Sequence, residues 1–102
     1  MRIAVVRGTV VSTQKISSMT GVKLVVVQWV DESGEPLPGY DVAADTVGSG
    51  VGEWVLISQG SAARQEEGYH QRPLDALVVG IIDTVTVERG FKYSKRDSDR
   101  LR

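Results

Sequence analysis

The 102-residue sequence contains no cysteine and a single histidine, His70. Without cysteine, the chain can form neither a disulfide framework nor a thiolate metal site. One histidine also leaves little scope for a base-activated nucleophile, and no pattern pairs it with Ser61, the serine that follows the central glycine-rich stretch. The sequence therefore predicts no catalytic residues, no metal site and no cofactor.

Aromatic residues are scarce at 6%, and the net charge is only −1. A groove for single-stranded nucleic acid needs basic side chains together with aromatic rings on which bases stack. No apolar run reaches the roughly 18 residues of a membrane-spanning helix, and a strand pattern begins at Arg2 without a secretory leader. We expect a cytoplasmic protein that binds neither nucleic acid nor a membrane.

The apolar pattern alternates with period two, which predicts a mainly β protein. Gly8 and Gly80 fall inside strand patterns, where glycine indicates a bulge or corner. With one short helix between the fourth and fifth strands, we expect a small closed five-stranded OB-like β-barrel. The strands are predicted over residues 2–13, 22–30, 40–47, 53–58 and 77–88, with a turn over 31–39.

Residues 48–64, GSGVGEWVLISQGSAAR, are the most informative stretch of the chain. The alternating glycines form a loop that can adopt positive φ, and the four apolar residues that follow predict a strand covered on both faces. Ser61 then caps a short helix over residues 62–67. These glycines do not match a dinucleotide-binding loop, because a strand follows them where that motif needs a helix.

The chain carries more apolar strand surface than one small barrel can bury. Both faces of the second strand are apolar, with Leu24 and Val26 on one and Val25, Val27 and Trp29 on the other. A chain of this length buries only about two-thirds of its unfolded surface, so contacts between subunits would stabilise it. Two different patches that meet head to tail close into a ring when the rotation allows.

Asp41 and Asp45 share one face of the third predicted strand. Paired carboxylates suggest acid–base chemistry or a metal site, but no third ligand lies near them in the sequence. We interpret this face as polar, with both carboxylates solvated or paired across a subunit boundary.

A family resemblance rests on the segments RGTVVSTQK (7–15), GVKLVVVQWVD (21–31), GSGVGEWVLISQGSAAR (48–64) and DALVVGIIDTV (75–85). Through them the chain closely resembles the EutN/CcmL family over about residues 1–93. Its carboxysome branch is the most similar in the segments YDVAAD (40–45) and FKYSKRD (91–97). The resemblance implies a structural protein of a bacterial microcompartment shell, whose homopentamers cap the icosahedral vertices beside hexameric shell proteins.

The domain organisation that follows is one vertex-type β-barrel domain, residues 1–93, and a basic C-terminal tail, residues 94–102. Residues 89–102 hold six basic and two acidic residues, a net charge of +4, whereas residues 1–88 hold six basic and eleven acidic residues, a net charge of −5. We expect the tail to lie on an acidic surface of a neighbouring subunit or of another shell component.

A pentamer brings five copies of one loop to a common axis. Alternating glycines bring backbone rather than side chains into such a crowded place, so we expect Gly48, Ser49 and Gly50 to line a narrow five-fold opening, with the Ser49 hydroxyl facing it. The alternative is an ordinary turn on the outer surface. The candidate residues of the subunit interface are Arg64, Trp54 and Ser61.

Two other classes of function stay open at this point. One is an OB-like module that binds single-stranded nucleic acid or oligosaccharide, which the few aromatic residues and the acidic barrel disfavour. The other is an enzyme or small-ligand sensor, which would need a pocket at a subunit boundary.

Overall fold

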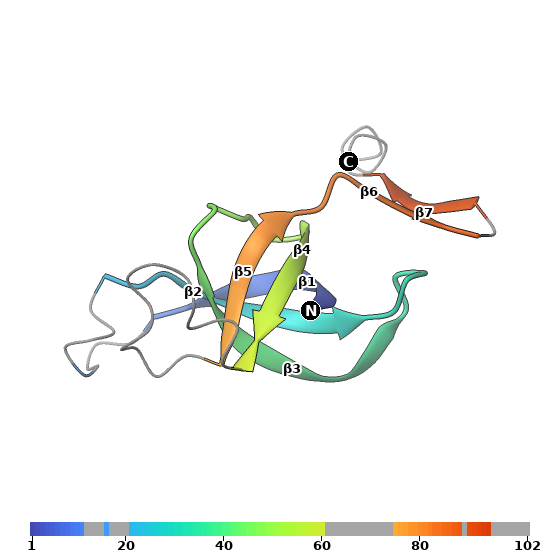
Figure 1. Ribbon diagram of the computed structural model, residues 1–102. Helices are drawn as coiled ribbons and strands as arrows, with labels where there is room; N and C mark the ends of the chain where they lie inside the picture. Colours follow the sequence, from blue (N-terminus) through green and yellow to red (C-terminus); the bar gives the residue numbers. More distant parts are fainter. Residues whose placement is uncertain (12–15, 17–20, 61–74, 89, 95–102) are drawn as a thin grey trace.

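The computed structural model describes residues 1–11, 16, 21–60, 75–88 and 90–94. Figure 1 shows five strands wrapped around a common interior and two more that extend away as a hairpin. Within the described residues, no helix is long and apolar enough to span a membrane. The strands are β1 (Arg2–Val10), β2 (Leu24–Val30), β3 (Pro36–Asp45), β4 (Trp54–Gln59), β5 (Ala76–Ile81), β6 (Thr84–Val87) and β7 (Gly90–Ser94).

The barrel closes in the strand order β1-β2-β3-β5-β4, which confirms the predicted closed five-stranded barrel. Neighbouring strands are antiparallel except β3 and β5, which run parallel and are joined by the pairs Ala44–Leu77 and Asp45–Val78. Closure pairs the backbone N–H and C=O groups at the edges of the barrel strands, so these edges are not available to other chains. The predicted helix over residues 62–67 lies outside the described residues.

Both glycines that were predicted to mark bulges do so. In β1 the register shifts between Val6 and Gly8, which leaves Arg7 as the extra residue opposite β2. In β5 the register shifts between Val78 and Gly80, opposite β4. Bulges bend a strand and increase its twist, which helps five short strands to close into a barrel.

The core fills the inside of the barrel, and β2 illustrates how the strands divide between core and surface. Val25 and Val27 are fully buried and Trp29 is 5% exposed, whereas Leu24 and Val26 on the opposite face are only half-buried. This confirms the two faces predicted for the second strand. The inner face supplies the core, and the outer face is left partly in contact with solvent.

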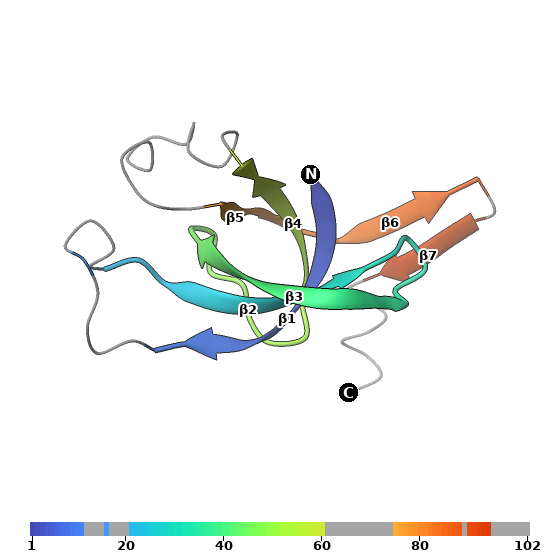
Figure 2. The same cartoon turned by 90° about the horizontal axis from the view of Figure 1, so that it is seen from below.

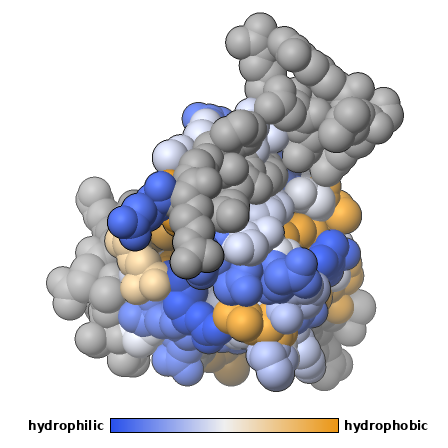
Figure 3. Space-filling view, turned by 90° about the vertical axis from the view of Figure 1, so that its right-hand side faces the viewer, coloured by the Kyte–Doolittle hydropathy of each residue, from blue (hydrophilic) through white to orange (hydrophobic). Residues whose placement is uncertain are grey.

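A second, smaller apolar cluster covers one end of the outer face. It consists of Val22, Ala44 and Leu77, with Leu24 and Val79 packed against it. Elsewhere the outer surface is mixed, and Figure 3 shows separate apolar areas among hydrophilic side chains on the face that lies to the right in Figure 1. The barrel therefore covers only part of its own outer apolar surface.

The prediction of one continuous last strand is wrong. β5 ends at Ile81 because β4 begins at Trp54 and offers no partner beyond that residue; the last bond runs from the Ile82 N–H to the Trp54 carbonyl, at 2.9 Å. The chain then forms a hairpin in which β6 pairs with β7, with Val87 opposite Gly90. The sequence held a signal for this hairpin, because two alternating segments, TVTV and FKYS, flank a short connection that contains glycine.

β6 and β7 form a sheet of their own rather than an extension of the barrel. The predicted boundary between domain (1–93) and tail (94–102) falls at the end of β7, whose last residue is Ser94. Residues 95–102 lie outside the described residues, so the role of the tail stays a prediction.

The third strand, β3, starts four residues earlier than predicted and ends two residues earlier. Its early start depends on Gln28, whose side-chain amide donates to the carbonyl oxygens of Leu37, at 2.7 Å, and Gly39, at 2.9 Å. These bonds hold a proline-containing segment beside β2, although proline itself cannot donate to the ladder. The early end depends on Asp45, which turns the chain as described below.

The turn between β2 and β3 is correspondingly shorter than predicted. The Asp31 carboxylate accepts the N–H groups of Ser33, at 2.8 Å, and Glu35, at 3.0 Å. Gly34 has a φ of +86° and lies against Trp54, so that an added Cβ would sit 2.7 Å from the indole ring. This position requires glycine both for its backbone conformation and for its lack of a side chain.

Ile57 and Leu56 are adjacent in β4 and point to opposite faces, so they allow a comparison of the core with the outer surface. Ile57 is fully buried and Leu56 is half-buried. Ile57→Ala should lower the free energy of unfolding by about 2–5 kcal/mol, because it leaves a cavity in a close-packed core. Leu56→Ala should cost less in a denaturant titration of the dissociated subunit, and equal costs would contradict this assignment of faces.

Candidate functional site: the glycine loop and its buried carboxylate

The glycine loop starts from the point where the barrel closes. Asp45 is the last residue of β3 and pairs with Val78 of β5 in the short parallel ladder. The hydroxyl of Thr46 donates to the carbonyl of Val78, at 3.3 Å, which continues the junction by one residue. The loop is therefore anchored to the closing strand at its first residue.

The carboxylate of Asp45 organises the first half of the loop. Its Oδ1 accepts the N–H groups of Val47, at 3.0 Å, and Gly48, at 3.1 Å. Its Oδ2 accepts both the N–H of Ser49, at 2.8 Å, and the Ser49 hydroxyl, at 2.9 Å. Lys23 reaches over from the start of β2: its ammonium lies 3.1 Å from Asp45 Oδ2 and donates to the Ser49 carbonyl, at 3.0 Å.

The side chain of Asp45 has no exposed surface, whereas that of Lys23 is 47% exposed. Burial alone raises the pKa of a carboxyl group, because it disfavours the charged form. At Asp45 the hydrogen bonds from Val47, Ser49 and Lys23 outweigh burial, so the pKa of this carboxyl lies below its ordinary value. An ionised group with this many donors supplies structure, and it is not poised to act as a base near neutral pH.

Glu53 holds the second half of the loop. Its carboxylate accepts the N–H of Gly50, at 2.6 Å, and its own N–H donates to the Gly50 carbonyl, at 3.1 Å. Gly52 then donates to the carbonyl of Val6 in β1, at 2.8 Å. Gly48 and Gly52 have φ values of +79° and +89°, a conformation that side chains disfavour, whereas Gly50 does not have a positive φ.

The expected outward orientation of the Ser49 hydroxyl is wrong. Ser49 is 4% exposed and its hydroxyl is bonded to Asp45, so the side chain points into the protein. The groups that the loop presents to solvent are the backbone at Gly48 and Gly50 and the apolar side chains of Val47 and Val51, the latter 60% exposed. The outer surface of the loop is backbone and apolar.

The interpretation of Asp41 and Asp45 as residues of a solvated polar face is also wrong for Asp45. Ala43, which lies between them on the same side of β3, is fully buried, so this side faces the barrel interior. Asp45 stays charged there because it lies at the mouth of the barrel, where the loop amides and Lys23 meet it. Across the described residues, no three His, Cys, Asp or Glu side chains come together in a way that would hold a metal ion.

The candidate interface residues are placed only in part. Trp54 is half-buried, pairs with Val5 of β1, and has Gly34 against its ring. Ser61 and Arg64 lie outside the described residues, as does His70. The assignment of Trp54, Ser61 and Arg64 to a subunit interface therefore stays a prediction.

Sequence reasoning missed the contribution of Asp45 and Lys23. One signal was available, since an aspartate that precedes a glycine- and serine-containing segment commonly accepts the N–H groups of the residues that follow it. Lys23 could not have been found in this way, because its contact with Asp45 depends on the pairing of β2 with β3, in which Leu24 lies opposite Ala44.

The barrel leaves part of its apolar outer surface uncovered, and contacts with other subunits can bury such a surface. In agreement, the sequence model of the family described as "Ethanolamine utilisation protein EutN/carboxysome" matches residues 1–83. The chain belongs to this family, EutN/CcmL.

Individual relatives give the same result. The carboxysome shell vertex protein CcmL of Synechocystis sp. is 59% identical over 100 residues, which cover 98% of this chain and all of the relative. The structure of Gloeobacter violaceus CcmL superimposes with a TM-score of 0.91 at 61% identity and covers 95% of this chain and 100% of that chain. The GrpN pentameric microcompartment shell protein from Rhodospirillum rubrum has a TM-score of 0.78 at 48% identity, over 85% of this chain and 99% of that chain.

These homologues are thus proteins of microcompartment shells, and relatives about 60% identical to this chain are carboxysome shell vertex proteins. Nothing in these likenesses supports an OB-like nucleic-acid binder.

Replacing the Asp45 carboxylate should destabilise the fold. Asp45→Asn keeps one acceptor oxygen but removes the charge and turns an NH2 group toward the donors on Ser49 and Lys23. We expect a loss of about 3 kcal/mol in the free energy of unfolding, because buried donors lose their acceptor. Asp41→Asn is the matched control; its carboxylate accepts the exposed N–H of Val42, so this variant should stay within about 0.5 kcal/mol of the unchanged protein. Equal effects of both substitutions would contradict the role given to Asp45.

The contribution of Asp45 should also depend on pH. The pKa of Asp45 is lower in the folded than in the unfolded protein, so the stabilisation is fully present above the ordinary value of 3.8 and is lost as the pH falls through the folded value. Denaturant titrations between neutral and strongly acidic pH should show the unchanged protein and Asp45→Asn converging below about pH 4. A gap between the two that is independent of pH would contradict this linkage.

Proposed function

We propose that this chain is a structural vertex protein of a carboxysome shell, and that five copies form a ring that closes each icosahedral vertex. The observation that carries the proposal is its membership of the EutN/CcmL family together with about 60% identity to carboxysome shell vertex proteins along nearly the whole chain. The pentameric state named for GrpN, which is 48% identical, supports the ring. In this proposal the protein acts inside the cell as part of the microcompartment shell.

The outer surface of the barrel supplies a physical reason for assembly. Val42 is 38% exposed and Tyr40 is 70% exposed on β3, and Val26 beside them on β2 is half-buried. Covering such apolar area is favourable by about 25 cal/mol for each Å² removed from water. In a heterologous contact one patch meets a different patch on the next copy, and the repeated rotation closes a ring. The sequence candidates Trp54, Ser61 and Arg64 belong to the same proposed boundary.

The glycine loop is the proposed lining of the five-fold axis, through Gly48, Ser49 and Gly50. Its conformation is fixed from within by Asp45 and Glu53, so each copy presents the same backbone surface. Because the Ser49 hydroxyl is engaged inside the subunit, the axial surface would be backbone and valine side chains rather than hydroxyl groups. Such an opening favours sealing of the vertex over transport of charged metabolites.

The proposed function includes no catalysis. The buried carboxylate of the described region is saturated with donors, and the proposed work of the protein is to present fixed surfaces to other shell components. The proposed partners are further copies of the chain within the ring and hexameric shell proteins around it.

The assembly is tested by measuring the mass of the purified protein. We expect native mass spectrometry at micromolar concentration to give a homopentamer, with each contact between neighbours burying more than roughly 1,000 Å² in total. Co-expression with hexameric shell proteins should yield closed particles with the chain and open ones without it. A monodisperse monomer in light scattering would overturn the ring, and closed particles of unchanged form in its absence would overturn the vertex role.

A bulky residue at Gly50 tests the axial position of the loop. An added Cβ there is 3.4 Å from Glu53 Oε1, an ordinary contact, and the backbone has no positive φ that would exclude tryptophan. At a five-fold axis, five indoles should crowd each other, so Gly50→Trp should destabilise the pentamer. Val11→Trp, at a site that is 88% exposed, is the control and should leave it intact. Normal pentamers with a fully solvent-exposed indole at position 50 would place the loop elsewhere.

A further inference from the structure

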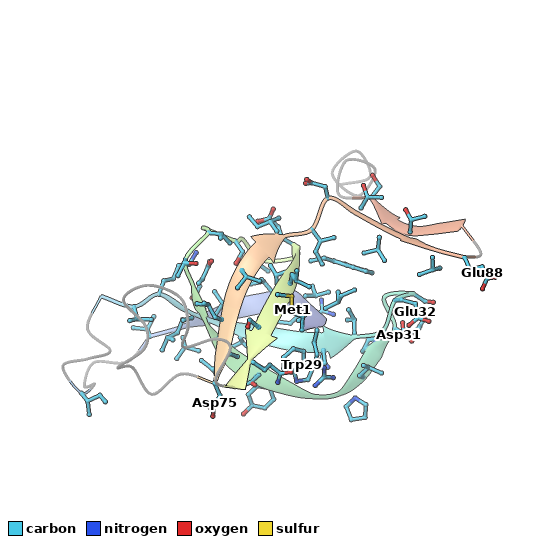
Figure 4. All side chains as sticks on the ribbon, in the orientation of Figure 1. Met1, Trp29, Asp31, Glu32, Asp75 and Glu88 are labelled. Atoms are coloured by element: carbon cyan, nitrogen blue, oxygen red, sulfur yellow. The ribbon has the colours of Figure 1, made fainter. Side chains whose placement is uncertain are left out.

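Within the described part of the chain, the β6–β7 hairpin forms no ladder with any strand of the barrel. Its strands pair with each other from Thr84–Ser94 to Val87–Gly90 and form a separate two-stranded sheet. Figures 1 and 2 show the hairpin extending away from the barrel in both views. Figure 4 places Glu88, at the hairpin turn, far from Asp75 at the opposite end of the barrel.

An isolated two-stranded hairpin is at best marginally stable in water and needs a surface to pack against. In β6 the exposed residues Thr84 and Thr86 alternate with the half-buried residues Val85 and Val87. One face of the strand is therefore apolar and the other polar, which is the pattern of a strand with a single covered side. The valine face is the one that would meet a partner.

The outer face of the barrel offers an apolar surface that matches this need. Gly8, Val26 and Val42 stand opposite each other across β1, β2 and β3. A Cβ added at Gly8 would meet no atom within 4 Å, so this row includes an open position beside two valines. Tyr40, on the same outer side of β3 as Val42, is 70% exposed. These four residues are called the valine row below.

We propose that the β6–β7 hairpin is an arm that packs its Val85 and Val87 face on the valine row of the adjacent copy in the ring. This proposal rests on the proposed pentamer, since the partner is a second copy of the same chain. The arm and the valine row are different surfaces, as a heterologous contact around a rotation axis requires.

The charge distribution favours a second copy as the partner. The chain from residue 89 onward carries a net charge of +4, and the part before it carries −5. An arm that continues into a basic segment is therefore attracted to the acidic remainder of another copy, and such complementarity raises the rate and the specificity of association. A basic partner would lack this attraction.

The extents of the matches bear on how far a ring depends on the arm. The family model ends at residue 83, one residue before β6. The pentameric relative GrpN is covered over 99% of its own length but over only 85% of this chain, so this chain is longer than a relative that already forms a ring. In this proposal the arm adds to contacts that the barrel itself makes in the ring, so its loss should weaken the pentamer without preventing folding.

The test is a charge exchange in the full chain, read out as dissociation of the pentamer on dilution. Val85→Lys on the arm and Val42→Asp on the valine row should each raise the concentration at half-dissociation by at least about tenfold. The double variant should recover most of this loss, because the two new charges then face each other across the contact. Thr86→Lys is the matched control; it adds the same charge to the opposite face of β6 and should change nothing.

The outcomes of this test distinguish the arm contact, the choice of the valine row and the ring itself. If Val85→Lys dissociates no more readily than Thr86→Lys, the arm does not rest on a neighbour through its valine face, while an intact pentamer leaves the proposed function standing. A further outcome is that both single variants weaken the ring while the double variant dissociates as readily as the two separate effects combined would predict. In that case the arm lies on a surface other than the valine row. If the unchanged protein is a monomer, the proposed ring is wrong and the arm proposal falls with it. Thermal unfolding of each dissociated variant confirms that the barrel itself is folded.

Discussion

The Asp45 carboxylate accepts five donors, and the rest of the structure depends on this interaction. β3 and β5 meet in only two parallel pairs, and Asp45 belongs to one of them. Without its side chain, the chain leaving β3 would have three consecutive N–H groups and a lysine ammonium with no common acceptor. One residue thus takes part in the closing ladder through its backbone and holds the glycine loop through its side chain.

The cost of burying the Asp45 carboxylate is offset here because hydrogen-bond donors and a lysine replace the water that the charge loses. Removing a charge from water costs several kcal/mol unless the group is paired and its lone pairs are satisfied. At Asp45 the compensating groups are mostly backbone amides, which are fixed by the fold, and Lys23 adds charge from a partly exposed position. The lowered pKa is the electrostatic signature of this balance, since the donors outweigh the effect of burial.

The features that sequence predicted well are those set by local periodicity. Alternation in residues 24–30 separated the two faces of the second strand, and the glycines inside strands indicated the bulges at Gly8 and Gly80. The features that it missed depend on contacts between distant segments. The side of β3 that carries Asp45 was read as polar because two of its three residues are acidic, whereas the burial of Ala43 shows that it faces inward. The break after Ile81 could not be read from β5 itself, because it reflects where β4 begins.

The glycine loop shows the same division between local and distant information. Its glycines correctly indicated a segment with positive φ, at Gly48 and Gly52. They could not indicate which way Ser49 would point, because that depends on the Asp45 acceptor, and a serine between glycines is equally compatible with an outward hydroxyl. A residue that looks like the functional group of the loop is instead part of its internal support.

Small size links these observations. A barrel of five short strands has an interior that a few valines and alanines fill, so much of the apolar surface of its strands remains on the outside. Val26, Val42 and Tyr40 belong to this outer surface of β2 and β3. Closure pairs the edges of the five barrel strands with one another, so in the proposed ring the barrel would meet its neighbours through its outer faces and loops. A ring built in this way depends on each subunit having a fixed shape, since a small change in the angle between neighbours is repeated at every contact. The buried carboxylate and the glycines set the backbone shape from inside the subunit. The side chains on the outer surface take no part in this, so they can be suited to the neighbours.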